Sequence, residues 1–213
     1  MAKRKSSRKE TGYYQLKMTL LEAPVPIWRR LVIASDLPLD LVHEIFQLAM
    51  GWSNYHLHQF ECGGKKYADL EEAEGDKTVL DHRKFSLQDL LENEGEELLY
   101  RYDFGDDWRH RVVLERIIKK KNSEDGFLAH CVGGKRACPP EDVGGVWGYA
   151  QFIEAIEDPD HEDGEEKLKW VGCDFDPDSF DARLVNLRID IFENNLLSLA
   201  ESMTEEELIA QRN

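Results

Sequence analysis

The sequence predicts an α+β fold, with a largely antiparallel sheet of hairpins, flanking helices and C-terminal helices. Runs of alternating apolar and polar residues come in pairs that are separated by short turn-forming segments, which is typical of β-hairpins. Residues 35–52 instead repeat their apolar residues at helical spacing, and residues 179–200 and 204–211 are also predicted as helices. The length of 213 residues fits one large domain, with or without a helical extension.

The first elements are two strands and a helix. Residues 13–33 predict two strands that are joined at a proline-containing turn. The helix that follows is expected to have Asp36 as its N-cap, Pro38 in its first turn and Gly51 at its end. The apolar residues that recur on one face of this helix are Val42, Ile45, Phe46 and Ala49.

The next segments are short. Residues 56–69 predict a hairpin that turns at Gly63 and Gly64. Residues 69–84 are polar and are expected to form a loop. Residues 86–95 predict a short helix that Ser86 caps.

The stretch "YRYDFGDDWRHRVVLE" predicts an aromatic hairpin. Strand alternation places apolar and aromatic side chains of both strands on one face. The expected cross-strand pairs on that face are Phe104–Trp108, Tyr102–His110, Tyr100–Val112 and Leu98–Leu114. On the other face the same register pairs Asp103 with Arg109, and it sets Arg101 opposite Arg111. Trp108 is therefore expected to be buried against Phe104.

Residues 130–149, "HCVGGKRACPPEDVGGVWGY", are expected to form a long loop that is rich in glycine and proline. We expect it to lie against the turn at residues 105–107, because Lys135 and Arg136 are the nearest cations for Asp106 and Asp107. A helix at residues 149–158 and an acidic connector follow, before the C-terminal helices.

The domain boundaries follow from composition. Residues 1–12 are expected to be a disordered basic tail, residues 13–200 the α+β domain, and residues 201–213 a C-terminal helix. The first ten residues carry five basic side chains against one acid, although the net charge of the chain is −16. Because the rest of the chain is strongly acidic, it repels phosphates, and contact with nucleic acid is expected only through the tail. The alternative is that the tail only increases solubility.

The expected location is the cytoplasm. No apolar run approaches the roughly 20 residues that cross a membrane, and the first residues lack the apolar core of a signal peptide. The four cysteines, Cys62, Cys131, Cys138 and Cys173, form no CxxC pair and are expected to be reduced thiols.

Several enzyme and metal motifs are absent. Asp103-Phe104-Gly105 matches the metal-binding triplet of protein kinases, but the glycine-rich loop, strand lysine and HRD loop are missing. Residues 158–169 do not form a calcium loop, because glycine is at the seventh place and Lys169 is at the twelfth. The sequence also contains no GxSxG, P-loop or dinucleotide-binding motif.

His56 and His58 form an HxH pair, whose side chains would point to the same side of a strand and could bind one metal ion. The third ligand would come from Asp103, Asp106, Asp107, His110 or Cys138. The alternative is a pair of half-buried histidines that are hydrogen-bonded within a sheet. Likewise, aspartates in a turn are commonly turn formers, and His110 is more typical of a core partner than of a catalytic base.

The proline-rich segment adds four candidate residues. Arg136 could bind an anion, Cys138 offers a thiol, and Glu141 and Asp142 offer carboxylates. The alternative interpretation is a rigid loop that covers one end of the sheet. The complete candidate site consists of His56, His58, Asp103, Asp106, Asp107, His110, Arg136, Cys138, Glu141 and Asp142.

Five stretches together resemble a known family. They are "PVPIWRRLVI", "HLHQF", "YDFGDDWRHRVVLE", "CVGGKRACPPEDVGGVWGY" and "FDPDSFD". They resemble the plasmid pRiA4b Orf-3-like family, over roughly residues 13–191. The resemblance implies an α+β domain of prokaryotic chromosomes and mobile elements, but no activity. Relatives are often labelled as transposon passenger proteins of the TnpR type, yet this sequence has no recombinase serine in an arginine-rich context. Relatives often carry a cysteine where Val143 stands, and its absence weakens a thiolate site built from Cys131 and Cys138.

Three functional hypotheses follow. The leading one is a non-enzymatic interaction module with an unknown protein partner. The second is a metal-dependent hydrolase or nuclease-like enzyme that uses His56, His58 and the nearby aspartates. The third is a nucleic-acid-associated accessory protein that uses the basic tail. No cofactor is expected under the first hypothesis, whereas the second requires a divalent metal ion.

Overall fold

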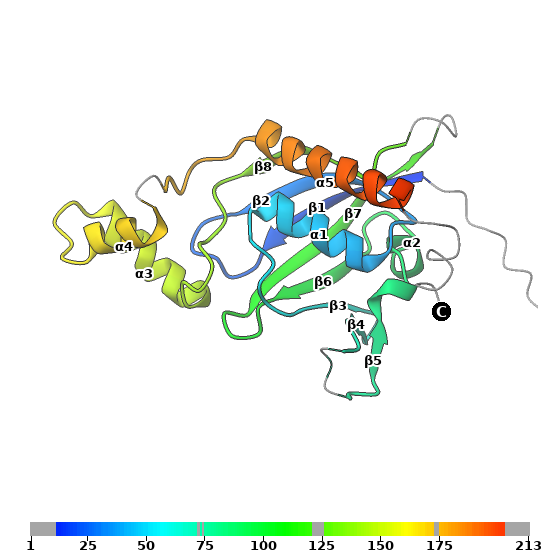
Figure 1. The fold of residues 1–213 in the computed structure, drawn as a ribbon. Helices are drawn as coiled ribbons and strands as arrows, with labels where there is room; N and C mark the ends of the chain where they lie inside the picture. The colour runs from blue at the N-terminus through cyan, green and yellow to red at the C-terminus, as the bar shows by residue number, and fades with distance from the viewer. Residues whose placement is uncertain (1–11, 72, 74, 121–125, 173–174, 203–213) are drawn as a thin grey trace, which may run out of the picture.

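The computed structural model describes residues 12–71, 73, 75–120, 126–172 and 175–202 (Figure 1). Their centre is an eight-stranded sheet with the strand order β5-β4-β3-β6-β7-β1-β2-β8. All neighbouring strands are antiparallel except β4 and β5, which are parallel. The α+β fold class predicted from the sequence is therefore confirmed.

The strands follow the hydrophobic alternation of the sequence. Their bounds are β1 Gly12–Leu20, β2 Trp28–Ala34, β3 His58–Cys62, β4 Lys65–Ala68, β5 Val79–Asp81, β6 Glu97–Tyr102, β7 Trp108–Lys119 and β8 Ala129–Lys135. The hairpins β1–β2 and β3–β4 are the ones that the sequence predicts. β5 lies in the segment that was expected to be loop, and the 3₁₀ turn His82–Lys84 follows it.

The helices have different positions relative to the sheet. Their bounds are α1 Leu39–Met50, α2 Leu87–Leu90, α3 Gly145–Glu157, α4 Gly164–Val171 and α5 Ala182–Ser202. Figure 1 shows α1 and α5 side by side over one face of the sheet, whereas α3 and α4 project beyond one end. The helix predicted after residue 203 lies outside the described residues.

The core fills the space between the sheet and α1. The apolar face of α1 is fully buried and consists of Val42, Ile45, Phe46 and Ala49, as the helical spacing predicts. Phe46 meets Tyr100 of β6 edge to face, with ring centroids 5.1 Å apart. Gly51 ends the helix with φ 95°, but the N-cap is Pro38 instead of Asp36. The predicted Asp36 cap is therefore wrong.

The β6–β7 hairpin has the predicted faces but a different register. Tyr102 lies opposite Trp108, Tyr100 opposite His110, and Arg101 opposite Arg109. The predicted pairs are wrong by two residues, because Asp103 to Asp107 form a five-residue turn closed by a hydrogen bond from the Asp107 N–H to the Asp103 carbonyl, 2.7 Å. A shift of two keeps every side chain on its predicted face.

Two aromatic residues show the consequence of this shift. Trp108 is buried, with 1% of its surface exposed, as predicted. Its predicted contact with Phe104 is wrong, since Phe104 lies in the turn, is 42% exposed and packs against the Arg101 guanidinium. The indole ring of Trp108 instead lies 5.9 Å from that of Trp52.

The segment at residues 130–149 is more regular than predicted. Its first part is the edge strand β8, and α3 begins at Gly145, so only residues 136–144 form a loop. β8 pairs with β2 through a register shift between Arg30 and Leu31, whose partners are Gly133 and Cys131, so Val132 is the extra residue of a bulge. The acidic connector likewise contains a helix, α4.

Candidate metal centre

Three segments that are far apart in the sequence meet at one end of the sheet. His56 lies just before β3, Asp103 just after β6, and Glu141 and Asp142 in the loop before α3. His56 Nε2 is 3.2 Å from Asp142 Oδ1, 3.7 Å from Asp103 Oδ2 and 3.9 Å from Glu141 Oε2. One imidazole nitrogen is therefore surrounded by three carboxylates.

Glu141 is held by one of its two oxygens. Its Oε1 accepts hydrogen bonds from the Ser53 backbone N–H, 2.7 Å, and from the Tyr102 hydroxyl, 3.2 Å. Burial and the Glu141 carboxylate raise the pKa of Tyr102, so this hydroxyl stays protonated and donates. Glu141 Oε2 is buried and has no hydrogen-bond partner among the described residues.

Asp103 is oriented in the same way. Its Oδ1 accepts hydrogen bonds from the backbone N–H groups of Gly105, 2.9 Å, and Asp106, 3.3 Å. This arrangement directs Oδ2 toward His56, and the whole residue is buried. Both Asp103 and Glu141 thus use one oxygen for support and present the other toward His56, as carboxylates near a metal site do.

His56 presents a buried nitrogen from a partly open ring. The side chain is 30% exposed, but Nε2 is buried and makes no hydrogen bond to any described residue. A buried polar atom without a partner is costly unless a ligand or ion satisfies it. The ring edge packs against Tyr102, with centroids 5.9 Å apart, which limits its rotation.

The backbone around the centre is strained. Asp103 and Asp142 have φ values of 54° and 57°, in the left-handed region that residues with a Cβ rarely adopt. Among the residues that the structure describes, four other non-glycine residues have positive φ, and three of them lie in the same three segments: Asn54, Asp107 and Arg136. Such strain concentrates at functional sites, where the surrounding structure fixes it.

The distances suit a divalent cation. Within the part of the chain that the structure describes, only His56, Asp103 and Asp142 form a set of three His, Cys, Asp or Glu ligand atoms within 4.8 Å of one another. Ligand atoms of one tetrahedral ion lie about 3.4 Å apart when each is about 2.1 Å from the metal. An oxygen-rich set with one imidazole suits Mn²⁺ or Zn²⁺ better than copper.

The loop that carries Glu141 and Asp142 is anchored on both sides. The Trp52 indole N–H donates to the Pro139 carbonyl, 3.0 Å, and the Gly144 N–H donates to Asp106 Oδ2, 3.2 Å. A Cβ on Gly145 would overlap the carbonyl oxygen of Asp106. The predicted contact between this loop and the 105–107 turn is therefore confirmed, and Asp106 supports the loop.

The predicted ion pair between Arg136 and this turn is wrong. Arg136 pairs with Asp178, 3.3 Å, which comes from the segment before α5. Asp107 is paired instead with Arg101 and Arg109, which stand opposite each other on the hairpin. The shifted register brings these two arginines to the turn, so Asp107 needs no cation from the loop.

Two further candidates lie in the interior. His110 is fully buried, and burial lowers its pKa to about 3. Hydrogen bonding to backbone groups of Tyr100 and Trp108 only partly offsets the effect of burial, and His110 occupies the core position that the sequence favours over the role of a catalytic base. Burial raises the pKa of the Cys138 thiol, which is the opposite of what a nucleophile or thiolate ligand needs.

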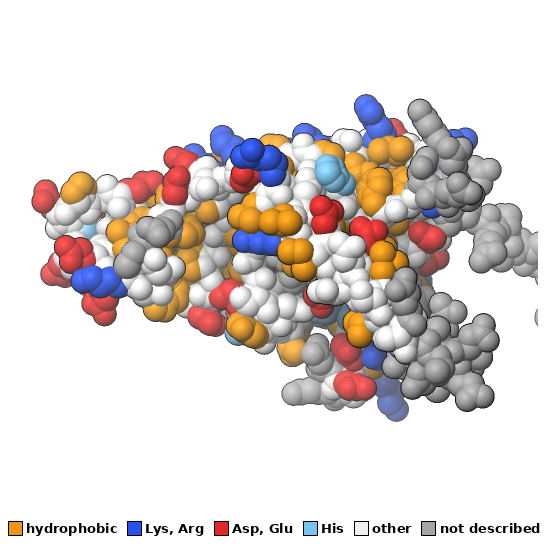
Figure 2. Space-filling view, turned by 45° about the horizontal axis from the view of Figure 1, so that its top comes forward, with side chains coloured by type: hydrophobic (Ala, Val, Ile, Leu, Met, Phe, Trp, Pro, Cys, Tyr) orange, Lys and Arg blue, Asp and Glu red, His pale blue; other side chains and the backbone are white. Residues whose placement is uncertain are grey.

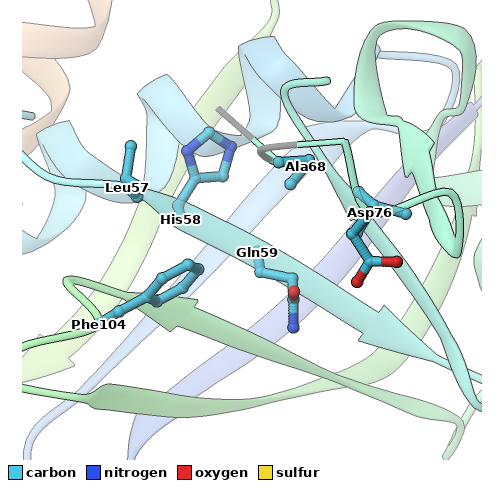
Figure 3. Close-up of a pocket in the computed structure, with 8 residues that line it drawn as sticks. Leu57, His58, Gln59, Ala68, Asp76 and Phe104 are labelled. Atoms are coloured by element: carbon cyan, nitrogen blue, oxygen red, sulfur yellow. The ribbon is translucent and has the colours of Figure 1, made fainter. Parts of the chain in front are cut away.

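His58 does not join His56. β3 begins at His58, so strand alternation does not extend back to His56, and the predicted HxH pair is wrong. The His58 ring stacks on that of His43, with centroids 3.4 Å apart, and its Nε2 lies 3.1 Å from Nδ1 of His82. Figure 3 shows His58 and Gln59 leaving β3 on opposite sides, beside a hollow of about 330 Å³ that Leu57 and Phe104 also line.

The sequence interpretation missed several residues that position these groups. Tyr102 and Ser53 hold Glu141, and His43 and His82 hold His58. The available signal for Tyr102 was its place on the buried face of β6. His43 and Gln47 are buried polar residues on α1, four residues apart. Two polar residues at this spacing in a mostly apolar helix were a signal that His43 has a specific partner.

No helix in the described ranges has the length and apolar character needed to cross a bilayer. Residues 1–10, on which the nucleic-acid hypothesis rests, lie outside the described residues, as does Cys173. The remaining cysteines, Cys62, Cys131 and Cys138, are free thiols.

Comparison with known proteins gives the family. The model of the plasmid pRiA4b ORF-3-like protein family matches residues 12–184. The chain belongs to this family. All four residues of the candidate metal centre lie within the matched range.

Two relatives extend over most of the chain. One is described as uncharacterized protein y4hQ from Sinorhizobium fredii (strain NBRC 101917 / NGR234) and is 37% identical over 178 residues, which are 83% of this chain and 90% of that protein. A crystal structure of the protein of unknown function MM3350 from Methanosarcina mazei Go1 is 39% identical, with a TM-score of 0.72. That match covers 81% of this chain and 97% of the solved chain.

Proposed function

We propose that this member of the pRiA4b ORF-3-like family is a divalent-cation-binding protein, whose ligands are His56, Asp103 and Asp142, with Glu141 beside them. The observation that carries the proposal is that His56 Nε2 is buried, makes no hydrogen bond to a described residue, and lies within 4.8 Å of carboxylate oxygens of Asp103 and Asp142. A cation held by these three ligand atoms would satisfy this nitrogen.

Electrostatics supports a cation at this point. Three carboxylates surround one imidazole, and like charges held this close destabilise each other unless a positive charge lies between them. Asp103 and Glu141 are each fixed by hydrogen bonds to one oxygen, so they cannot turn away from each other freely. A bound ion would therefore contribute to the stability of the fold.

The role that this geometry supports is structural. The ion would join the loop at residues 136–144 to the β6–β7 hairpin and to the segment before β3. A clamp of this kind fits the hypothesis of a non-enzymatic interaction module, since it would fix the shape of one end of the domain. The hydrolase hypothesis is weaker, because one of its two histidines, His58, faces His43 and His82 instead.

A hydrophobic surface on α5 supports the interaction module. Three side chains at helical spacing are about half exposed on this helix: Leu184, Leu187 and Ile191. Figure 2 shows hydrophobic side chains gathered on this side of the molecule, with charged side chains between them. If the partner is a second copy, sedimentation will show a dimer that Leu187→Gln weakens, whereas a monomer at every concentration would contradict self-association.

Metal titration tests the proposed function. Metal-free protein titrated calorimetrically with Mn²⁺ and, separately, with Zn²⁺ should bind one ion per chain. Loss of a group that only orients a metal ligand usually weakens metal binding by about 10–100-fold. His56→Ala and Asp103→Asn remove ligands themselves, so each should weaken binding by more than this. Binding that survives both substitutions would contradict the proposal.

Two control variants match these substitutions. His130→Ala removes an exposed histidine of β8, and Asp160→Asn removes an exposed acid between α3 and α4. Both should bind the ion with unchanged affinity. Equal losses in the controls would mean that the ion binds the acidic surface diffusely and not at this centre.

A further inference from the structure

A polar cavity of about 310 Å³ lies beside the metal centre. Its walls come from α1, the segment before β3, and the 3₁₀ turn after β5. The residues that matter here are Asp40, Glu44, Asn54, His58, Asp69 and His82. Its volume is at the lower end of the range for small-molecule sites, and its lining is more polar than is usual for them.

The hydrogen bonds of the wall fix which groups donate. Gln47 Nε2 donates to the Tyr100 hydroxyl, 2.8 Å, which therefore directs its own hydrogen to His43 Nδ1, 2.8 Å. His43 then carries its proton on Nε2 and donates it to Asn54 Oδ1, 2.6 Å. The Asn54 amide donates to Glu44 Oε1, 2.9 Å. This series of hydrogen bonds uses the donors of the wall within the protein and ends on the carboxylate of Glu44.

The wall consequently presents an excess of acceptors. Asp40 Oδ1 is buried and has no hydrogen-bond partner among the described residues. Asp69 Oδ2 is 4.0 Å from His82 Nε2, and its other oxygen is 3.5 Å from the Arg83 guanidinium. Arg83 also pairs with Asp81, so the one guanidinium of the wall is already engaged.

Two histidines of the wall, His43 and His82, do not offset this negative charge. Burial lowers the pKa of His43 to about 4, and it also lowers the pKa of His82. Both rings are therefore neutral at neutral pH. Three carboxylates, from Asp40, Glu44 and Asp69, thus face one arginine that is paired twice.

A single metal ion does not fit this cavity. Among the described residues, no three His, Cys, Asp or Glu ligand atoms lie within 4.8 Å of one another except those of His56, Asp103 and Asp142. The acceptors of the cavity are spread over its walls. A ligand that satisfies them must carry several donors at separate points.

We propose that this cavity binds a small organic cation with ammonium or guanidinium groups. Its donors would meet Asp40 and Asp69, and Tyr55, which is 82% exposed and lines the cavity, would cover the cation with its ring. The inference does not depend on a bound metal ion, although His56 lines this cavity as well as the metal centre.

Binding of agmatine and 1,4-diaminobutane tests the inference. Titration of the full-length protein, followed by NMR and calorimetry at 150 mM salt, should give saturable binding of either amine. Glutarate, a dianion of similar length, should not bind. Asp40→Asn and Asp69→Asn should each weaken amine binding at least tenfold, whereas Asp160→Asn, an exposed acid elsewhere, should leave it unchanged.

Each outcome decides the inference. Absence of saturable amine binding by folded protein would overturn it, as would binding that Asp40→Asn and Asp69→Asn leave intact. Glutarate binding as tight as amine binding would overturn the predicted ligand charge. Asp103→Asn separates the two sites: amine binding should survive in this variant when metal binding is lost, so failure of the metal site would not remove the amine site.

Discussion

At the scale of single residues, Glu141 shows how the site is prepared for an ion. One of its oxygens is fixed by the Ser53 N–H and the Tyr102 hydroxyl, and the other is left buried near His56. Tyr102 also accepts a hydrogen bond from the Tyr55 N–H, 3.1 Å, which ties the His56 segment to the same hydroxyl. This one phenol therefore positions two of the groups that would meet the ion.

Removal of the Tyr102 hydroxyl should weaken metal binding without unfolding the protein. Tyr102→Phe leaves the ring in place but frees Glu141 and the segment before β3. We expect about a 10–100-fold loss of Mn²⁺ affinity by calorimetry, as for other groups that orient metal ligands. The matched control is Tyr14→Phe, which removes a buried hydroxyl bonded to the Leu91 carbonyl away from the site. A loss of equal size in the control would contradict the assigned role.

Trp108 tests the packing of the hairpin. Because its indole is almost fully buried, Trp108→Ala should lower the free energy of unfolding by about 3–5 kcal/mol. Trp147, which is 86% exposed, offers the contrast: Trp147→Ala should change stability by no more than about 0.5 kcal/mol. Urea denaturation measures both variants, and an unchanged midpoint for Trp108→Ala would refute the packing.

His110 should make the protein sensitive to acid. Its pKa is about 3 in the fold, where burial disfavours the charged ring, against 6.5 for a free histidine. Between these two values the unfolded chain binds a proton that the folded chain does not, so stability falls as pH is lowered from 6.5 toward 3. His43, with a pKa of about 4, contributes in the same direction down to about pH 4.

Replacement of His110 by leucine isolates its contribution to the pH dependence of stability from that of the other histidines. The ring of His110 is neutral and makes no hydrogen bond to another described side chain, so His110→Leu should cost no more than about one hydrogen bond, roughly 0.5–1.5 kcal/mol, at pH 7.5. Below pH 6.5 the free energy of unfolding of the variant should fall less steeply with decreasing pH than that of the wild type, by a slope equivalent to about one proton. Denaturation curves at several pH values measure this slope, and an unchanged slope would show that His110 is not buried as a neutral ring.

At the scale of elements, the hairpin shows what the sequence could and could not predict. Alternation identified the strands and the buried face of β6 and β7, because the period of two depends only on the residues themselves. The register depended on the length of the turn, which two aspartates in left-handed conformation, Asp103 and Asp107, extend to five residues. Turn composition alone indicated a turn but not its length.

The candidate site was likewise predicted only in part from the sequence. The sequence indicated that the loop at residues 136–144 would lie against the turn at residues 105–107, and this contact is confirmed. It could not show that β3 starts after His56, so it treated His56 and His58 as one pair. It also gave Arg136 the wrong partner, since the position of Asp178 beside the loop depends on how the chain returns after α4.

Gly145 should be necessary for the loop to reach the hairpin. A Cβ there would overlap the Asp106 carbonyl, so Gly145→Ala should move the loop, destabilise the fold and weaken metal binding through Asp142. Gly64→Ala is the control, because Gly64 also has positive φ, 74°, but open space around it. The control should show only the cost of the backbone conformation, with unchanged Mn²⁺ affinity by calorimetry. Unchanged affinity in Gly145→Ala would contradict the proposed closeness.

At the scale of the whole molecule, the metal centre would connect three segments that are far apart in the sequence. The segment before β3, the β6–β7 turn and the loop before α3 are brought together only when the sheet is complete, and each supplies a ligand. The net charge of −16 favours a cation at this position. Metal affinity should therefore report on the integrity of the whole domain.

The location of the ion tests the central claim most directly. Crystals of the protein grown with Mn²⁺ and measured near the manganese absorption edge would show bound metal as anomalous density. The account predicts one strong peak about 2.0–2.3 Å from His56 Nε2, Asp103 Oδ2 and Asp142 Oδ1, within usual bond lengths for such ligands. Full-occupancy density elsewhere on the chain, or none between these three side chains at saturating Mn²⁺, would contradict it.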